Sequence, residues 1–395
     1  MSKMYYRELY CGSPVRFWMG LTLLGAIIAV GLGAAYYMEH QGHWVTGMSN
    51  QIVWGLPHVF AIFLIVAASG ALNVASIGSV FGGPLYKPLG RYSALLAIGL
   101  LVGGLIVLVL DLGRPDRLIV AMTEYNFKSI FAWNVILYSG FVAIVAVYLW
   151  TMMDRSMEKF KRPLGFAAFF WRIALTTGTG SIFGFLVARE AYDAAIMAPM
   201  FVIMSFSYGL AFFIITLIAA YMWGDREIGD YRLTKLKNLL GVFVGAVLYF
   251  VLAFNLTNLY VAQHHGIERF ILLDGGIYTM MFWIGQILIG SVIPLFLIYS
   301  PAFENSRWAI AVASIAVLIG GFFQIYVIVI GGQAYPMNLF PGKEIIETGF
   351  FDGQIINYVP TFPEAALGIA GMAVSLAMVA IGARVFKVFP ETLED

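Results

Sequence analysis

Residues 92–110 read YSALLAIGLLVGGLIVLVL, an apolar run without a single charged side chain. The hydrocarbon core of a bilayer, ~30 Å thick, is crossed by ~20 helical residues, so this run predicts a transmembrane helix. Similar runs occupy about 16–37, 52–80, 92–113, 131–152, 164–188, 194–223, 238–263, 275–300, 307–331 and 363–387. Their apolar residues are continuous and do not alternate with polar ones, which excludes a β-barrel. The sequence therefore predicts an all-α, polytopic transmembrane helical bundle of about ten helices.

The composition agrees with a chain that lies almost entirely in the lipid bilayer. Of its 395 residues, 61% are hydrophobic and 11% are charged, whereas soluble domains have ~25% charged residues. We therefore expect residues 1–395 to form a single integral membrane domain. The net charge of +1 creates no field that would attract nucleic acid. The polar start is followed by a full-length apolar run, so we expect no removable signal peptide.

The distribution of lysine and arginine predicts the orientation. If the N-terminus is inside, the loops on that side hold most of the Lys and Arg residues of the chain. By the positive-inside rule, both termini are then cytoplasmic in a multi-pass protein of the cytoplasmic (inner) membrane. The outer side carries two long loops, 38–51 and 332–362, and a loop of ~30 residues is usually functional or a docking surface.

Cysteine and histidine limit the redox groups that the chain itself can hold. Cys11 is the only cysteine, which excludes a Cys-ligated iron–sulfur cluster or a covalently attached haem within this chain. A membrane haem needs axial histidines inside the bilayer, and among the five histidines only His58 lies within an apolar run. We therefore expect no haem and no Fe–S cluster here, and also no metal site at the adjacent His264 and His265.

Polar residues gather at the predicted outer end of four consecutive helices. They are Asn50, Gln51, Trp54, His58, Asp111, Arg114, Trp133, Asn134, Glu190, Tyr192 and Asp193. Polar groups in lipid are costly and are functional candidates by default. A pocket with a histidine, two tryptophans, an amide and an Asp/Arg pair suits a quinone, whose carbonyls need donors, whose ring needs apolar walls and whose reduction takes up two protons.

Each of these residues also has a purely structural interpretation. Trp54 and Trp133 are the type of residue found in interfacial aromatic belts. The sequence DLGRPDR at 111–117 is typical of a helix stop, and His58, which follows Pro57, could cap or kink its helix. The presence of these residues at the same end of four consecutive helices favours a quinone site over the structural interpretations.

Several charges suggest a route for protons. We expect Asp111 and Arg114 to pair at the membrane edge, with Glu190 and Asp193 as a second carboxylate route. Arg172, alone inside the fifth helix, either snorkels to the inner interface or forms a step of a proton path.

Three segments resemble the NrfD family of quinone-interacting membrane subunits, which includes the membrane anchor of polysulfide reductase. They are NQIVWGLPH at 50–58, LDLGRPDR at 110–117 and FKSIFAWN at 127–134. The resemblance is specific over about 50–190. Helix count and the long outer loop are most similar to the longer, ten-helix branch, as in the DsrP subunit of DsrMKJOP complexes. We expect two four-helix bundles, helices 2–5 at about 50–190 and helices 6–9 at about 194–331, then the outer loop 332–362 and a last helix at about 363–387.

The resemblance implies a haem-free membrane subunit of a respiratory or sulfur-metabolism complex. It would exchange electrons between menaquinone or ubiquinone and a periplasmic ferredoxin-like Fe–S subunit, beside other membrane and cytochrome subunits. His58 takes the place of the family's quinone-binding histidine, and Asn50 or Gln51 that of its amide. The family's tyrosine has no direct counterpart, because helix 5 reads LTTGTGSIFGF at 175–185. Its role would fall to Thr177, Thr179 or Ser181, or to Tyr192 and Tyr138 nearby.

Two other functions compete with this one. A passive membrane anchor would hold such a complex together while another subunit binds quinone, and the altered helix 5 is compatible with it. A secondary transporter is the third hypothesis. Transporters place their polar groups near the membrane midplane, whereas those of this chain lie at one end of the first bundle.

Overall fold

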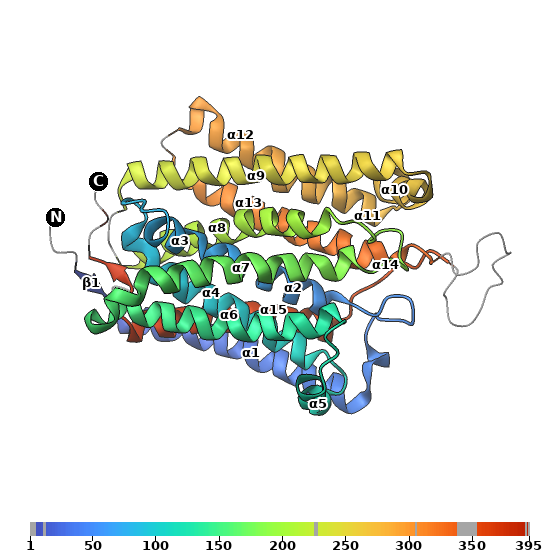
Figure 1. The fold of residues 1–395 in the computed structure, drawn as a ribbon, viewed down its shortest axis with the longest axis horizontal. Helices are drawn as coiled ribbons and strands as arrows, with labels where there is room; N and C mark the ends of the chain where they lie inside the picture. The colour runs from blue at the N-terminus through green and yellow to red at the C-terminus, as the bar shows by residue number, and fades with distance from the viewer. Residues whose placement is uncertain are drawn as a thin grey trace.

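The computed structural model describes residues 5–10, 13–224, 228–304, 306–337, 354–391 and 393. Long helices run side by side along one direction (Figure 1). The helices are α1 (Pro14–Gln41), α2 (Leu56–Ala71), α3 (Asn73–Ser79), α4 (Gly90–Leu110), α5 (Leu118–Thr123), α6 (Ile130–Met153), α7 (Lys161–Gly184), α8 (Met197–Trp223), α9 (Asp230–Tyr260), α10 (His265–Arg269), α11 (Ile277–Met280), α12 (Ile293–Tyr299), α13 (Arg307–Tyr326), α14 (Gly332–Ala334) and α15 (Phe362–Val385). A π-helix, Met281–Val292, joins α11 to α12, and a second, Val327–Gly331, joins α13 to α14.

Within the described ranges, nine helical segments are long and apolar enough to cross a membrane. The expectation of an all-α polytopic bundle is confirmed. The tenth expected span, 164–188, corresponds to α7, which has 24 residues but is not one of the nine. Lys161, Arg162 and Arg172 lower its hydropathy.

Helix α2 is the centre of the fold, since it packs against both α4 and α8. A Cβ added to Gly70 of α2 would lie 1.6 Å from the backbone oxygen of Ser205, and one added to Gly209 of α8 would lie 2.1 Å from the backbone nitrogen of Ala71. Glycine therefore lets the two backbones touch, as is common between membrane helices. Helix α2 and the residues at its start are held between the two halves of the bundle.

The first and last long helices pack outside this core. Helix α15 lies between α1 and α4, and Gly103 of α4 approaches Gly371 and Ser375 of α15 so closely that a Cβ would not fit. Strands β1 (Tyr6–Arg7) and β2 (Phe389–Pro390) pair antiparallel, which brings the two ends of the described chain to one end of the bundle. The opposite end carries α5, α10 and α14 (Figure 1), and we call it the α5 end.

Candidate functional site

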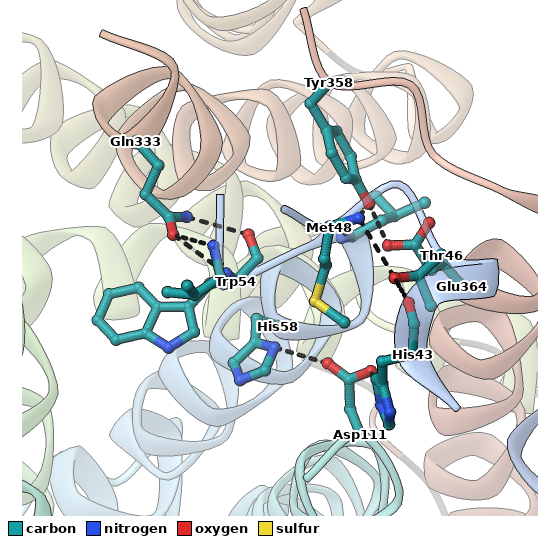
Figure 2. Close-up of polar contacts among 11 residues, drawn as sticks. His43, Thr46, Met48, Trp54, His58, Asp111, Gln333, Tyr358 and Glu364 are labelled. Carbon is teal, nitrogen blue, oxygen red and sulfur yellow. Dashed lines mark hydrogen bonds and ion pairs between the residues drawn. The ribbon is translucent and has the colours of Figure 1, made fainter. Parts of the chain in front are cut away.

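A buried carboxylate meets an imidazole at the α5 end. His58 lies in the first turn of α2, next to Pro57. The fixed φ of proline suits the start of a helix. Asp111 is the C-cap of the neighbouring helix α4. The His58 Nδ1 atom lies 2.7 Å from Oδ2 of Asp111 (Figure 2). The structure thus brings together two residues that the sequence placed at the same end of two helices.

A second histidine approaches the same carboxylate. His43 Nε2 lies 3.8 Å from Oδ1 of Asp111, and the Asp111 side chain is fully buried. Neither contact meets the geometry of a hydrogen bond, so the imidazoles attract the carboxylate where they are protonated, and this attraction is strong where water is excluded. Protonated imidazoles would offset the unfavourable effect of the helix dipole on a carboxylate at the C-terminal end of a helix. We call His43, Asp111 and His58 the histidine–aspartate cluster.

The expected pairing of Asp111 with Arg114 is wrong. Arg114 instead binds Asp116 through two hydrogen bonds of 2.9 and 3.0 Å, and both side chains are more than half exposed. Gly113 adopts a positive φ of 69°. This conformation redirects the chain into the exposed turn that contains Arg114 and Asp116. The Arg114 guanidinium lowers the pKa of Asp116, and such an exposed pair contributes little to stability.

Aromatic rings form a wall beside His58. The ring centroid of Trp54 lies 6.3 Å from that of His58, with the planes nearly parallel, and 6.5 Å from that of Tyr192. Phe183 meets Trp54 edge-on at 5.8 Å, and Phe131 lies at 6.2 Å. The sequence analysis included Trp54 and Tyr192 but missed the two phenylalanines, because phenylalanine in an apolar run does not differ from a residue that faces lipid.

Gln333 of α14 holds the backbone of Trp54 in place. Its Oε1 accepts hydrogen bonds from the N–H groups of Val53 and Trp54 at 2.9 and 3.0 Å. Its Nε2 donates to the carbonyls of Trp54 and Val329 at 3.0 and 2.8 Å. Figure 2 shows this amide turned toward the segment before α2. The sequence analysis missed Gln333, although a buried amide at the end of an apolar run is a signal of this kind.

A second set of hydrogen bonds holds the segment before α2 to the start of α15. Glu364, which is fully buried, accepts hydrogen bonds from the Tyr358 hydroxyl at 2.5 Å, from the Thr361 N–H at 2.8 Å and from the Gly47 N–H at 2.9 Å. The Tyr358 hydroxyl in turn accepts from the Leu56 N–H at 2.7 Å (Figure 2). The T-x-x-E spacing at 361–364 is a capping-box signal. It predicts the hydrogen bond between Thr361 and Glu364 but not those from Tyr358 and Gly47.

The predicted amide Gln51 binds backbone carbonyls of α14. Gln51 is buried, and its Nε2 donates to the carbonyls of Gln333 and Ala334 at 3.1 Å. Arg189 donates to the carbonyl of Gln51 at 2.7 Å and to that of Gln333 at 3.2 Å. Asn50 is exposed. Gln51 therefore links the segment before α2 to α14 and is a positioning residue.

Three further candidates join or flank α6 and α7. Asn134 donates to the carbonyl of Gly178 at 3.1 Å, and the Thr179 hydroxyl lies 3.1 Å from that of Tyr138. These hydrogen bonds connect the two helices. Trp133 is 45% exposed and donates to the carbonyl of Phe127, which agrees with its interpretation as an interfacial aromatic residue.

The charged candidates differ in burial. After α7, Asp193 is exposed and Glu190 is partly buried, and this burial raises the pKa of Glu190. Arg172 is 2% exposed, with its guanidinium carbon 4.9 Å from the ring centre of Phe169 and 5.1 Å from that of Phe206. The side chain therefore does not snorkel to the interface, and two aromatic faces stabilise its charge inside the bundle.

Comparison with known sequences identifies the family. The family described as "Polysulphide reductase, NrfD" matches residues 44–337. The chain belongs to the NrfD family. The matched range contains the histidine–aspartate cluster except for His43, together with Trp54 and Gln333, and it excludes α1 and α15. The NrfD resemblance seen in the sequence is confirmed.

Relatives with known names extend the similarity over nearly the whole chain. An "Hdr-like menaquinol oxidoreductase integral membrane subunit" of Archaeoglobus fulgidus is 28% identical over 96% of this chain and 95% of its own length. A "Putative dimethyl sulfoxide reductase membrane subunit" of Halobacterium salinarum is 27% identical, over 94% and 91%. A "Menaquinone reductase, integral membrane subunit" of Nitratidesulfovibrio vulgaris is 20% identical, over 96% and 93%. This NrfD chain is therefore similar to integral membrane subunits over the outer helices α1 and α15 as well.

Proposed function

We propose that this chain is the quinone-interacting integral membrane subunit of an oxidoreductase complex, with the quinone head group beside His58 at the α5 end. The observation that carries the proposal is the buried Asp111 carboxylate against Nδ1 of His58, next to the Trp54 wall. The names of two relatives refer to menaquinol and menaquinone, which favours menaquinone over ubiquinone.

The residues present fit a quinone. Asp111 occupies the Nδ1 side of the His58 ring, so Nε2 is the nitrogen available to a quinone carbonyl. The ring is 14% exposed, and Trp54 offers an aromatic face beside it. A bound quinone supplies two-electron, two-proton redox chemistry. Histidine is the side chain whose ordinary chemistry suits proton exchange near neutral pH, and Asp111 lies against Nδ1 of the His58 ring.

His43 connects the cluster to water. Its side chain is 24% exposed, and it lies on the other carboxylate oxygen of Asp111. We infer that a proton held at His58 is exchanged with the aqueous phase through Asp111 and His43. His43 thus takes the role that the sequence analysis assigned to Arg114, which faces outward.

Partner subunits must carry the electrons, since Cys11 is the only cysteine of the chain. We propose that a ferredoxin-like Fe–S protein docks at the α5 end, on the periplasmic side, with other membrane and cytochrome subunits around the bundle. Both termini are then cytoplasmic. A role in sulfur metabolism and a likeness to DsrP subunits stay predictions from the sequence.

The alternative is a passive membrane anchor, and a binding titration separates the two. A fluorescent or quenching menaquinone analogue is titrated into the purified complex with the wild-type chain, His58→Ala or the exposed control His265→Ala. Loss of a charge-assisted hydrogen bond worth ~1.5–3 kcal/mol weakens binding by roughly tenfold or more. We expect this loss for His58→Ala alone. Equal affinity of all three assembled complexes would support the anchor.

A further inference from the structure

A second polar cluster lies in the other half of the bundle, again at the α5 end. It surrounds a cavity of about 50 Å³ between α9, α10, α13 and the π-helix Met281–Val292. Most of the lining is apolar, and the polar lining residues are Asn255, Asn258, Glu268, Gln286 and Gln324. Amides inside a helical bundle commonly hydrogen-bond one helix to another, and the proposed quinone site does not use these ones.

Glu268 of α10 is the charged group of this cavity and is 2% exposed. Its Oε2 accepts a hydrogen bond from Nδ2 of Asn258 at 3.1 Å. Its Oε1 has no hydrogen-bond partner among the described residues. Oδ1 of Asn258 lies 3.0 Å from Nδ1 of His264. A buried carboxylate with one oxygen unpaired must take up a proton or bind water.

The lining of the cavity also includes an unpaired donor. Gln324 of α13 accepts a hydrogen bond from the Tyr208 hydroxyl through Oε1 at 2.5 Å, which sets the orientation of its amide. Its Nε2 finds no partner in the part of the chain that the structure describes. Glu268 and Gln324 therefore line one cavity with one free acceptor and one free donor.

The size of the cavity decides which ligand it can hold. Sites for drug-sized ligands have volumes of ~300–1,000 Å³, and a cavity needs roughly 10–15 Å³ of accessible volume to hold one water. At about 50 Å³, this cavity is too small for a quinone ring and has room for a few waters. Buried waters typically bridge polar groups that lack other partners. Oε1 of Glu268 and Nε2 of Gln324 are two such groups.

The helices around the cavity are also irregular. Gln286 belongs to the π-helix Met281–Val292, and Val327 and Ile328 belong to the π-helix Val327–Gly331. The π form is rare and occurs frequently at functional sites. A third π-helix, Phe270–Asp274, contributes Ile271 to the same lining. Three π segments around one cavity are a second, independent indication that this region is more than packing.

We propose that Glu268 is a proton-binding residue in a hydrated site of the second bundle, which exchanges protons with the aqueous phase at the α5 end. Oε1 accepts one proton from a cavity water, and that water regains a proton by way of His264 and the surface. One proton moves and no electron is transferred. The proposal does not depend on a quinone at His58.

The environment of Glu268 supports titration near neutral pH. Burial raises the pKa of Glu268 to about 7. Several titratable groups lie on or beside α10 in the described chain. They are His264 at its N-cap, His265 and Arg269 on the helix, and Tyr335 beside Gly266. Arg269 is bound by Asp274 at 2.6 Å, so its charge is already balanced. Glu190, after α7, interacts with His264, and Tyr208 of α8 donates to Gln324.

Infrared difference spectroscopy of the purified complex, titrated with pH in H2O and D2O, tests the proposal. We expect a protonated-carboxyl C=O band that shifts in D2O, loses its intensity as the pH rises through about 7 and is absent in Glu268→Gln. The exposed control Glu158→Gln keeps the band. A band that persists in Glu268→Gln, or the lack of any carboxyl band near neutral pH, overturns the proposal.

A second variant keeps the test valid if Glu268→Gln does not fold. Gln324→Leu retains Glu268 but removes the unpaired donor from the cavity lining, so the cavity waters stabilise the carboxylate less and the midpoint rises. An unchanged midpoint contradicts the water bridge. A midpoint that follows the sodium concentration at constant ionic strength makes the cavity a cation site and overturns proton binding.

Discussion

Gln333→Leu tests whether the hydrogen bonds of Gln333 position Trp54, because it leaves the Trp54 side chain itself unchanged. The substitution conserves size approximately but removes the acceptor of two backbone N–H groups, Val53 and Trp54, and the donor to the carbonyl of Trp54. A buried donor left without a partner costs ~1–3 kcal/mol. Local rearrangement toward water recovers part of this cost, so we expect a loss of unfolding free energy of about 2–4 kcal/mol.

The same change should weaken quinone binding, because Trp54 would no longer be held beside His58. A loss of ~1.4 kcal/mol in binding corresponds to tenfold in affinity, and we expect about that loss. Thermal unfolding in detergent and titration of a menaquinone analogue measure the two effects, with the exposed Gln263→Leu as the matched control. Wild-type stability and wild-type affinity of Gln333→Leu would refute the positioning role.

Three further predictions follow from the same contacts. Asp111→Asn should lower affinity for the quinone analogue several-fold, while Arg114→Gln should leave it unchanged and shift stability by less than ~0.5 kcal/mol, since its pair with Asp116 is exposed. An equal effect of both variants in the titration would contradict the cluster. Glu364→Ala leaves the Tyr358 hydroxyl and two N–H groups without their acceptor. It should lower the free energy of unfolding by about 3–5 kcal/mol. A loss below about 1 kcal/mol would contradict the role of Glu364 in holding the segment before α2. The pKa of Glu268 rises to about 7 from its ordinary 4.5, so its contribution to stability is present below pH 4.5 and is lost as the pH rises through 7. Chemical unfolding between these pH values should show a loss of up to ~3 kcal/mol in the wild type and a smaller one in Glu268→Gln.

The helices could be predicted from the sequence because each needs only a long apolar run. The same reasoning placed His58 and Asp111 at one end of neighbouring helices. It could not predict their contact, because the choice between His58 and Arg114 as the partner of Asp111 depends on the direction that the chain takes after Gly113.

The contacts that hold the site together join residues far apart in the sequence. Gln333 binds Trp54, and Glu364 binds Gly47, across most of the length of the chain. A buried amide or carboxylate in the sequence signals that a partner exists, but only the packing of α14 and α15 reveals which one. Packing also decides that Asn134 joins α6 to α7.

The most direct test of the central claim is photo-crosslinking of an azido-menaquinone analogue to the assembled complex, followed by mapping of the labelled peptides. A quinone beside His58 predicts labelling of the segments 50–58 and 183–192, which contain Trp54, His58, Phe183 and Tyr192, with loss of this labelling in His58→Ala and in the presence of excess menaquinone. Specific labelling confined to another subunit, with both segments of this chain unlabelled, would contradict the account and make the chain an anchor.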